Sequence, residues 1–140
     1  MSTIAIKPSG APIVIRFVLA VVMLCFESLF TTGCAPLCGN QLVRTIAQPT
    51  GSKSIVIFER DCGATTDFVI HLSVIESGTA LSDGMVGNTF IADSNKGQVN
   101  MNVEAEWTSP LSVVIRYPAG ARVHSRNSSV GHVRVAYEEF

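Results

Sequence analysis

Four cysteines and three histidines are the residues of this sequence whose types could carry covalent chemistry. The cysteines are Cys25, Cys34, Cys38 and Cys62. A cysteine becomes a nucleophile when its pKa is depressed and a base lies beside it. Arg60 favours a thiolate at Cys62, but Asp61 stands directly beside that thiol and opposes it. Zinc is poorly supported, because the sequence has no C-x-x-C or H-x-x-x-H spacing.

An apolar run ahead of Cys34 is typical of an export signal. The ten residues Phe17–Phe26 are all apolar, Lys7 and Arg16 precede them, and the first acidic residue is Glu27. This run is half of the roughly 20 residues that a membrane-spanning helix needs. The sequence therefore predicts that residues 1–33 are a signal peptide, with an uncleaved membrane anchor as the alternative.

The residues that follow the run are similar to a bacterial lipobox, the signal that directs lipidation of a cysteine and cleavage just before it. They read Thr31-Thr32-Gly33-Cys34, with threonine where that pattern usually has leucine. Lipidation at Cys34 would leave a mature domain over residues 34–140. Ordinary cleavage after Ala35 is the alternative, but it would place Pro36 directly after the cut.

Cys38 and Cys62 remain once Cys25 is discarded with the signal and Cys34 is lipidated. An even pair in an oxidising compartment favours a disulfide. The bond would close a loop of about 25 residues and contribute roughly 3–4 kcal/mol in the chain-entropy model. The alternative is an enzyme in which Cys62 is the nucleophile and His71 the base.

Polar residues crowd the segment around Cys62 and form a candidate binding loop. They are Arg60, Asp61, Thr65, Thr66 and Asp67. The alternative is that the aspartate and the threonines bond their own turn, as these residue types often do. The sequence has no phosphate-binding glycine loop, no Ser-His-Asp order and no dinucleotide fingerprint. We therefore predict no catalytic residue, no metal and no cofactor.

Length and charge exclude other classes of protein. The 140 residues suffice for one domain, and 47% of them are apolar, which argues against intrinsic disorder. Ten Lys and Arg against 11 Asp and Glu give a net charge of −1. A nucleic-acid binder needs a basic face, so we expect no nucleic-acid partner.

The elements that must position these residues read as short strands. Ser54–Arg60 is nearly all apolar, which predicts a central strand covered on both faces. In the next strand Phe68, Ile70, Leu72 and Val74 share one face, and His71 is expected on the other face, half-exposed. Further strands are predicted at 41–47, 88–92 and 133–137, and the segments 76–87 and 118–129 are predicted as loops.

The sequence also predicts a β-hairpin over residues 99–117. Val99–Trp107 alternates strictly between apolar and polar residues, and Leu111–Tyr117 continues the alternation after a Ser-Pro turn. Arg116 is expected near Glu104 or Glu106. The paired carboxylates themselves are interpreted as a solvated strand face.

About seven strands without an amphipathic helix predict an all-β fold for the mature chain. Turn signals roughly every ten residues favour a compact antiparallel β-sandwich or a small barrel. An N-terminal hydrophobic signal or anchor helix is expected to precede this single extracytoplasmic domain.

Two short elements of the sequence resemble a group of small uncharacterised bacterial lipoproteins. One is Cys38-Gly39-Asn40, and the other is Arg60-Asp61-Cys62-Gly63-Ala64-Thr65-Thr66. Trp107 to Pro110 and Val114 to Tyr117 resemble a later hairpin of that group. The chain has Asp67 where the group usually has glycine. The resemblance implies export and pairing of Cys38 with Cys62, and it implies no activity.

The sequence as a whole predicts an exported, lipid-anchored protein of the cell envelope that faces the periplasm or the exterior. Ala35 after Cys34 favours the outer membrane if the host has one. The expected role is a non-enzymatic binding or interaction module, with an envelope protein or the cell wall as partner. The alternatives are the Cys62–His71 enzyme and a membrane-anchored accessory subunit in which residues 13–33 stay uncleaved.

Overall fold

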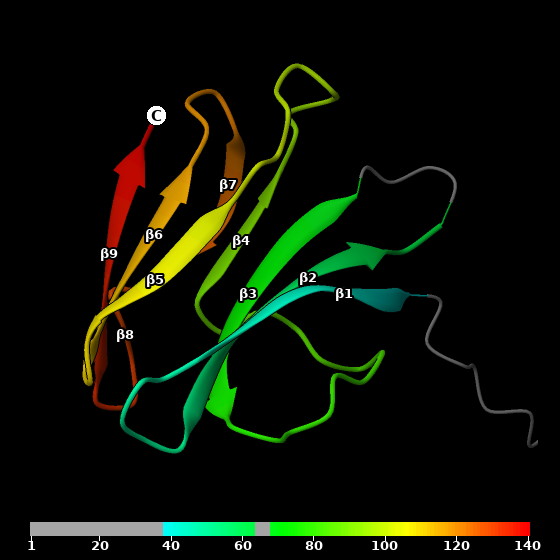
Figure 1. Ribbon diagram of the computed structural model, residues 1–140. Helices are drawn as coiled ribbons and strands as arrows, with labels where there is room; N and C mark the ends of the chain where they lie inside the picture. The colour runs from blue at the N-terminus through cyan, green and yellow to red at the C-terminus, as the bar shows by residue number, and fades with distance from the viewer. Residues whose placement is uncertain (1–37, 64–67) are drawn as a thin grey trace, which may run out of the picture. The chain divides into compact units, whose positions relative to one another are not determined.

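The computed structural model describes residues 38–63 and 68–140, which contain nine strands and no helix. The predicted N-terminal helix and the segment 1–33 lie outside these residues. Figure 1 labels the strands, which are listed here in chain order: β1 (Gly39–Ala47), β2 (Lys53–Asp61), β3 (Val69–Glu76), β4 (Phe90–Asp93), β5 (Glu104–Ser109), β6 (Ser112–Tyr117), β7 (Arg122–Arg126), β8 (Ser129–Val130) and β9 (Val133–Glu139).

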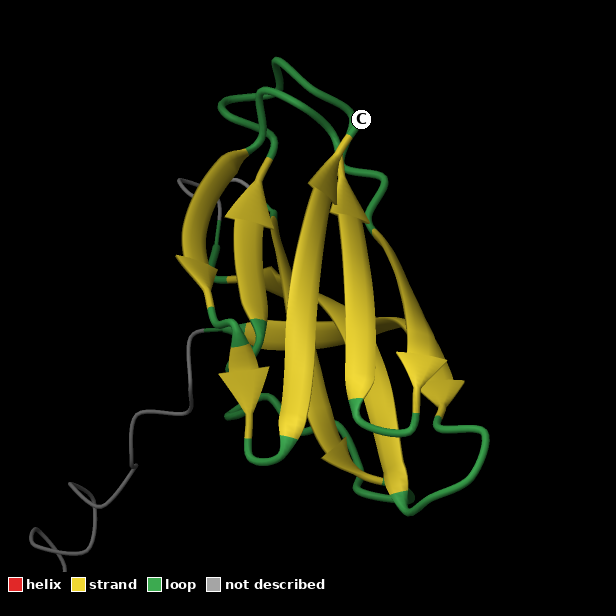
Figure 2. Cartoon of the chain, turned by 90° about the vertical axis from the view of Figure 1, so that its left-hand side faces the viewer, coloured by secondary structure: helices red, strands yellow, loops and turns green. Residues whose placement is uncertain are grey.

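The strands form two sheets, as expected for an all-β fold. The first sheet has the order β1-β2-β3-β4-β7 and the second has the order β5-β6-β9-β8. Figure 2 shows them as two layers, with the strands of one in front of the other. Core residues come from both sheets, so the two layers pack face to face as a sandwich.

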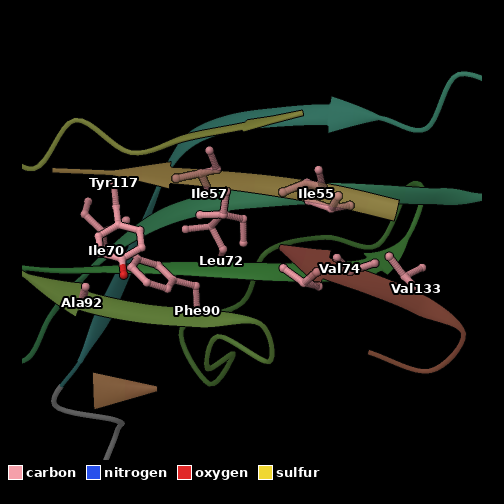
Figure 3. Close-up of a cluster of buried hydrophobic side chains, with 12 residues drawn as sticks. Ile55, Ile57, Ile70, Leu72, Val74, Phe90, Ala92, Tyr117 and Val133 are labelled. Carbon is pink, nitrogen blue, oxygen red and sulfur yellow. The ribbon is translucent and has the colours of Figure 1, made fainter. Parts of the chain in front are cut away.

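The core lies between the inner faces of the two sheets (Figure 3). Alternate residues of each strand supply it, because successive side chains of a strand point to opposite faces. The first sheet contributes Ile55, Ile57, Ile70, Leu72, Val74, Phe90 and Ala92, and the second contributes Val113, Ile115, Tyr117, Val133 and Val135. Phe90, Leu72, Ile115 and Val133 have no exposed surface.

The second sheet differs from the antiparallel prediction at one place, because β6 and β9 are parallel. The strand β7 pairs with β4 in the first sheet, and after two residues β8 pairs with β9 in the second. The chain therefore crosses from the first sheet to the second between β7 and β8. It then turns into β9, which runs parallel to β6. The whole of β7 and the first residue of β8 fall in the segment 118–129 that the sequence predicted as a loop, since β7 is polar and mostly exposed.

Within the predicted strand Val99–Trp107, only the residues from Glu104 onwards pair with a neighbouring strand. The alternation itself is confirmed over its whole length, because the apolar residues are half-buried and the polar ones exposed. The first half has no partner strand because β6 ends at Tyr117 and Glu104 already lies opposite Arg116. The predicted ion pair is also present, since Arg116 Nη2 lies 3.0 Å from Glu106 Oε1.

The segment 77–89 covers the outer face of the first sheet. Val56 and Phe58 point away from the core cluster, and yet both are buried. The backbone N–H of Gly87 donates to His71 Nδ1 over 2.9 Å, and that of Asn88 donates to Ser73 Oγ over 3.1 Å. The prediction of a half-exposed His71 is therefore wrong, because its side of the sheet is covered and the residue is only 5% exposed.

Gly87 lies where this covering segment touches the sheet. A Cβ atom there would sit 2.9 Å from the carbonyl oxygen of Phe90 and 3.1 Å from that of Leu72. We therefore expect Gly87→Ala to lower the free energy of unfolding by about 1–3 kcal/mol. Gly84→Ala is the matched control, because nothing lies within 4 Å of its Cβ position. Urea unfolding of both variants tests this, and equal stabilities would contradict the packing argument.

Candidate functional site

A disulfide joins Cys38 to Cys62, as the sequence predicted. Cys38 directly precedes the first residue of β1, Gly39, and Cys62 directly follows the last residue of β2, Asp61, and these two end residues are paired. The bond therefore closes the open end of the β1–β2 hairpin. The sulfur of Cys62 is not a thiol in this state, and His71 is buried with its Nδ1 already accepting a hydrogen bond.

Arg60 attaches the covering segment to the sheet. Its Nη1 donates to Asn40 Oδ1 over 3.0 Å and to the carbonyl oxygens of Asp83 and Met85 over 2.9 Å each. Asn40 adds to this network, since its side-chain amide donates to the carbonyl oxygens of Ser82 and Met85 over 2.7 and 2.8 Å. The sequence placed Arg60 in a candidate binding loop. In the described structure its Nη1 instead stabilises the fold.

Asp61 has the local role that its residue type suggests. Its Oδ1 accepts a hydrogen bond from the backbone N–H of Gly63 over 2.8 Å. Its side chain also lines a hollow beside the disulfide, so it remains available to a ligand. Thr65, Thr66 and Asp67, the other members of the predicted binding loop, lie outside the described residues.

Glu59 is the polar residue that breaks the inward pattern of β2. Ile55 and Ile57 face the core, and Glu59 is next in the same alternation. On the neighbouring strand β3 it lies opposite Ile70, which belongs to the core. Within residues 38–63 and 68–140, no hydrogen bond or ion pair holds the Glu59 carboxylate. The end of the sandwich therefore carries an inward-facing acid at the edge of the core.

Two hollows meet at Glu59 and Phe68. The first, of about 390 Å³, lies beside β1 and is also lined by Asn40, Asp61 and Asp83. The second, of about 480 Å³, lies between the first sheet and the segment 94–101. We call the second hollow the end cleft; it is lined by Glu59, Phe68, Ile70, Ser94, Lys96, Gly97, Val99, Asn100 and Met101.

Phe68 differs from its predicted position on the core face of β3. Its neighbours in the alternation are buried, but Phe68 lies just before the strand and is 59% exposed. It stands at the rim of both hollows, because the second sheet does not extend over this end of β3. An exposed aromatic ring beside a carboxylate can contact a ligand that combines an apolar part with a positive charge.

The charged residues that line the two hollows are mostly acidic, and Arg60 lies beside the first hollow, where its Nη1 donates to Asn40 and to Asp83. Glu59, Asp61 and Asp83 line the two hollows, and Lys96 is the one cation among the described lining residues. Asp83 is partly engaged, since its Oδ1 accepts the backbone N–H of Asn40 over 3.0 Å. The arrangement favours a cationic group over an anionic one.

His71 stays neutral under the covering segment. Burial, together with the positive charge of Arg60 and the field of His124, lowers the pKa of His71 to about 4. Its ring also packs at 5.3 Å from that of Phe58, centroid to centroid. Because Nδ1 accepts the Gly87 N–H, Nε2 carries the proton of the neutral ring.

A buried carboxylate on β4 holds β7 to the first sheet. Asp93 is 1% exposed, and Arg122 donates to its Oδ2 from Nη2 over 2.6 Å and from Nε over 3.0 Å. His124 Nε2 lies 2.7 Å from the same oxygen, and the Asn95 N–H donates to Oδ1 over 2.8 Å. Burial raises the pKa of Asp93, but these hydrogen bonds outweigh it and lower that pKa to about 2.

Sequence reasoning missed Glu59, Lys96 and the Asp93 network as features of the molecule. The signal for Glu59 was present, because a charged residue stands where the alternation of β2 requires an inward side chain. No local signal marks Asp93, since its partners come from a polar strand some thirty residues later (separations of 29 and 31).

Within residues 38–63 and 68–140, no three His, Cys, Asp or Glu side chains lie close enough to hold a metal ion. The same residues contain no helix with the length and apolar character needed to cross a membrane.

Replacement of Asp93 tests the role of its network. We expect Asp93→Asn to lower the free energy of unfolding by about 2–4 kcal/mol, because Arg122 loses its buried carboxylate partner. The folded pKa lies below the ordinary value, so the carboxylate stabilises the fold above about pH 4, and this contribution is lost as the pH falls toward 2.

Urea unfolding at pH 7, 4 and 2 measures both effects. Wild-type protein should lose more stability than Asp93→Asn between pH 4 and pH 2. Glu106→Gln is the control, because its ion pair with Arg116 is exposed and such pairs contribute less than about 1 kcal/mol. Similar losses in the two variants at pH 7 would show that Asp93 has no special role.

Comparison of the chain with protein-family models, with curated proteins and with solved structures found no match. The resemblance of the Cys38 and Arg60–Thr66 elements to bacterial lipoproteins therefore stays a prediction.

Proposed function

We propose that this protein is a lipid-anchored binding module of the cell envelope, non-enzymatic, which holds its partner at the end of the sandwich around Glu59 and Phe68. The end cleft carries this proposal. It combines an open hollow, an exposed aromatic ring and a carboxylate that no other described residue holds. Sites with these features bind ligands, because the unpaired polar group fixes orientation while the apolar lining supplies contact area.

The rigid surroundings of the cleft support the same proposal. The Cys38–Cys62 disulfide closes the adjoining hairpin, and Arg60 ties β2 to the covering segment. A preorganised surface loses little conformational freedom when a partner binds. The disulfide is also consistent with an oxidising compartment outside the cytoplasm.

The proposed anchor would lie close to this end of the domain. Cys34 precedes Cys38 by four residues, which span at most about 14 Å when extended. A lipid on Cys34 would therefore hold the Cys38–Cys62 end of the sandwich near the bilayer surface. Partners that reach the end cleft would then be molecules at or close to the membrane.

The anchor is tested by the intact mass of the protein extracted from membranes, with and without reductant and alkylation. We expect a mass for residues 34–140 plus a lipid, with no free thiol before reduction. Cys34→Ala should abolish the lipid and release the protein from the membrane fraction. A full-length mass in the wild type would favour an uncleaved anchor, and an alkylatable Cys62 would revive the cysteine-enzyme alternative.

The binding end is tested by photo-crosslinking in cells that express the full chain. A photoreactive phenylalanine analogue replaces Phe68 in one variant and Leu111 in the other. Both side chains are similarly exposed, at 59% and 52%, but Leu111 lies in the β5–β6 turn, away from the cleft. We expect a discrete envelope adduct from position 68 and none from position 111. Equal labelling at both positions, or none at either, would contradict the proposed binding end.

A further inference from the structure

We infer that the end cleft binds the side chain of a lysine within a peptide segment that lies at the membrane surface. This inference rests on the proposed function and adds the chemical class of the ligand. Its basis is the match between the lining of the cleft and a side chain that has an apolar stem and a cationic head.

The floor and rim of the cleft fit the stem. Ile70 is a core residue that is 7% exposed and lines the cleft, so part of the cleft wall is apolar. Val99 and Met101 also line the cleft, and Met101 packs against the core of the sandwich. The four methylene groups of a lysine side chain can make apolar contacts with this lining, and each buried CH₂ contributes about 0.8 kcal/mol.

The acid at the cleft fits the head. Glu59 is half-buried and has no hydrogen-bond or ion-pair partner among the described residues, so its carboxylate can accept a charge-assisted hydrogen bond from a ligand ammonium. The exposed ring of Phe68 lines the same cleft, and an exposed cation–π contact contributes about 0.5–1 kcal/mol. Asp61 and Asp83 in the neighbouring hollow add to the negative field.

The positive charge of Lys96 provides a test of the sign of the ligand's charge. Lys96 lines the same cleft and would repel a ligand ammonium. Removal of its charge should therefore strengthen binding of a cationic peptide, whereas a site for carboxylates would lose affinity. The two signs separate the cationic ligand from an anionic one.

The proposed tether supplies the location of the peptide. An anchor four residues before Cys38 keeps the cleft near the bilayer, so the lysine would belong to a segment at the surface of that membrane. Anionic lipid headgroups are disfavoured as occupants, because the cleft and its neighbouring hollow carry three carboxylates against one lysine.

The experiment compares two blocked peptides on the full-length protein in detergent. One is acetyl-Ala-Lys-Ala-amide, and the other carries norleucine, which keeps the stem and lacks the ammonium. Binding is followed by calorimetry at low ionic strength. We expect the lysine peptide to bind at least about fivefold more tightly than the norleucine peptide, since one charged contact is worth about 1 kcal/mol or more.

Three charge variants complete the test. Glu59→Gln should weaken the lysine peptide by about five- to tenfold and leave the norleucine peptide unchanged. Lys96→Met should strengthen the lysine peptide by about twofold or more. Glu76→Gln is the charge-matched control, because Glu76 lies at the opposite end of β3 from the cleft (Figure 1), and it should have no effect.

The outcomes separate this inference from the proposed function. Equal binding of the two peptides, or equal affinities in Glu59→Gln and Glu76→Gln, would overturn the lysine ligand. If the crosslink at position 68 persists in that case, the binding module stands with another ligand. Unchanged or weaker binding of the lysine peptide in Lys96→Met would contradict the charge argument and overturn the inference as well. Thermal unfolding of each variant confirms that the isosteric replacement of Glu59 preserves the fold.

Discussion

Burial of β2 on both faces is the constraint on which the rest of the structure depends. Ile55 and Ile57 point into the sandwich, while Val56 and Phe58 point to the other side and are buried as well. Only one of these faces can meet the second sheet. The other requires a cover, and the segment 77–89 supplies it through hydrogen bonds to His71 and to Ser73. Covering loops are stable only when their backbone groups find partners, which these polar side chains provide.

The same strand builds the candidate site where its apolar run ends. Beyond Phe58 the alternation continues with polar residues, so Glu59 faces inward and Arg60 faces the covering segment. Arg60 donates to two carbonyl oxygens of that segment and to Asn40 on β1, whereas the Glu59 carboxylate has no partner among the described residues. The strand then ends at the disulfide, which closes the hairpin at this point. One continuous segment thus supplies the support of the site on one face and its chemistry on the other.

The proposed function follows from the position of this end in the chain as well as from its lining. The first strand begins five residues after the cysteine that carries the proposed lipid, and the end cleft lies at the adjoining end of β2. A short tether would restrict the cleft to the surface of the membrane and exclude partners that stay far from it. A rigid cleft of mixed lining, held at a fixed height, is a reasonable design for recognition of a membrane-proximal peptide.

The strand β7 lies at the opposite edge of the first sheet, and its contacts with the sheet are of a different kind. The strand β7 is polar and exposed, and it contributes little apolar burial to the fold. Its attachment depends instead on a buried charge: Asp93 on β4 receives Arg122 and His124 from β7. The connection matters for the topology, because the chain passes from β7 into β8 and only then runs parallel to β6.

The sequence by itself determined the features that depend on local periodicity and on residue type. The apolar run of β2 predicted a strand covered on both faces, the alternation of Val99–Trp107 predicted which side chains are shielded, and the cysteine pair predicted the disulfide. Only the tertiary structure decided the parallel pairing of β6 with β9, the strand β7, the burial of His71 and the inward carboxylate of Glu59. Periodicity states which side chains share a face, but the partner of a strand edge and the cover of a face come from segments distant in the chain. A polar strand such as β7 carries no apolar pattern at all, so its place in the sheet is visible only from the partners it meets, which are the backbone of β4 and the buried carboxylate of Asp93.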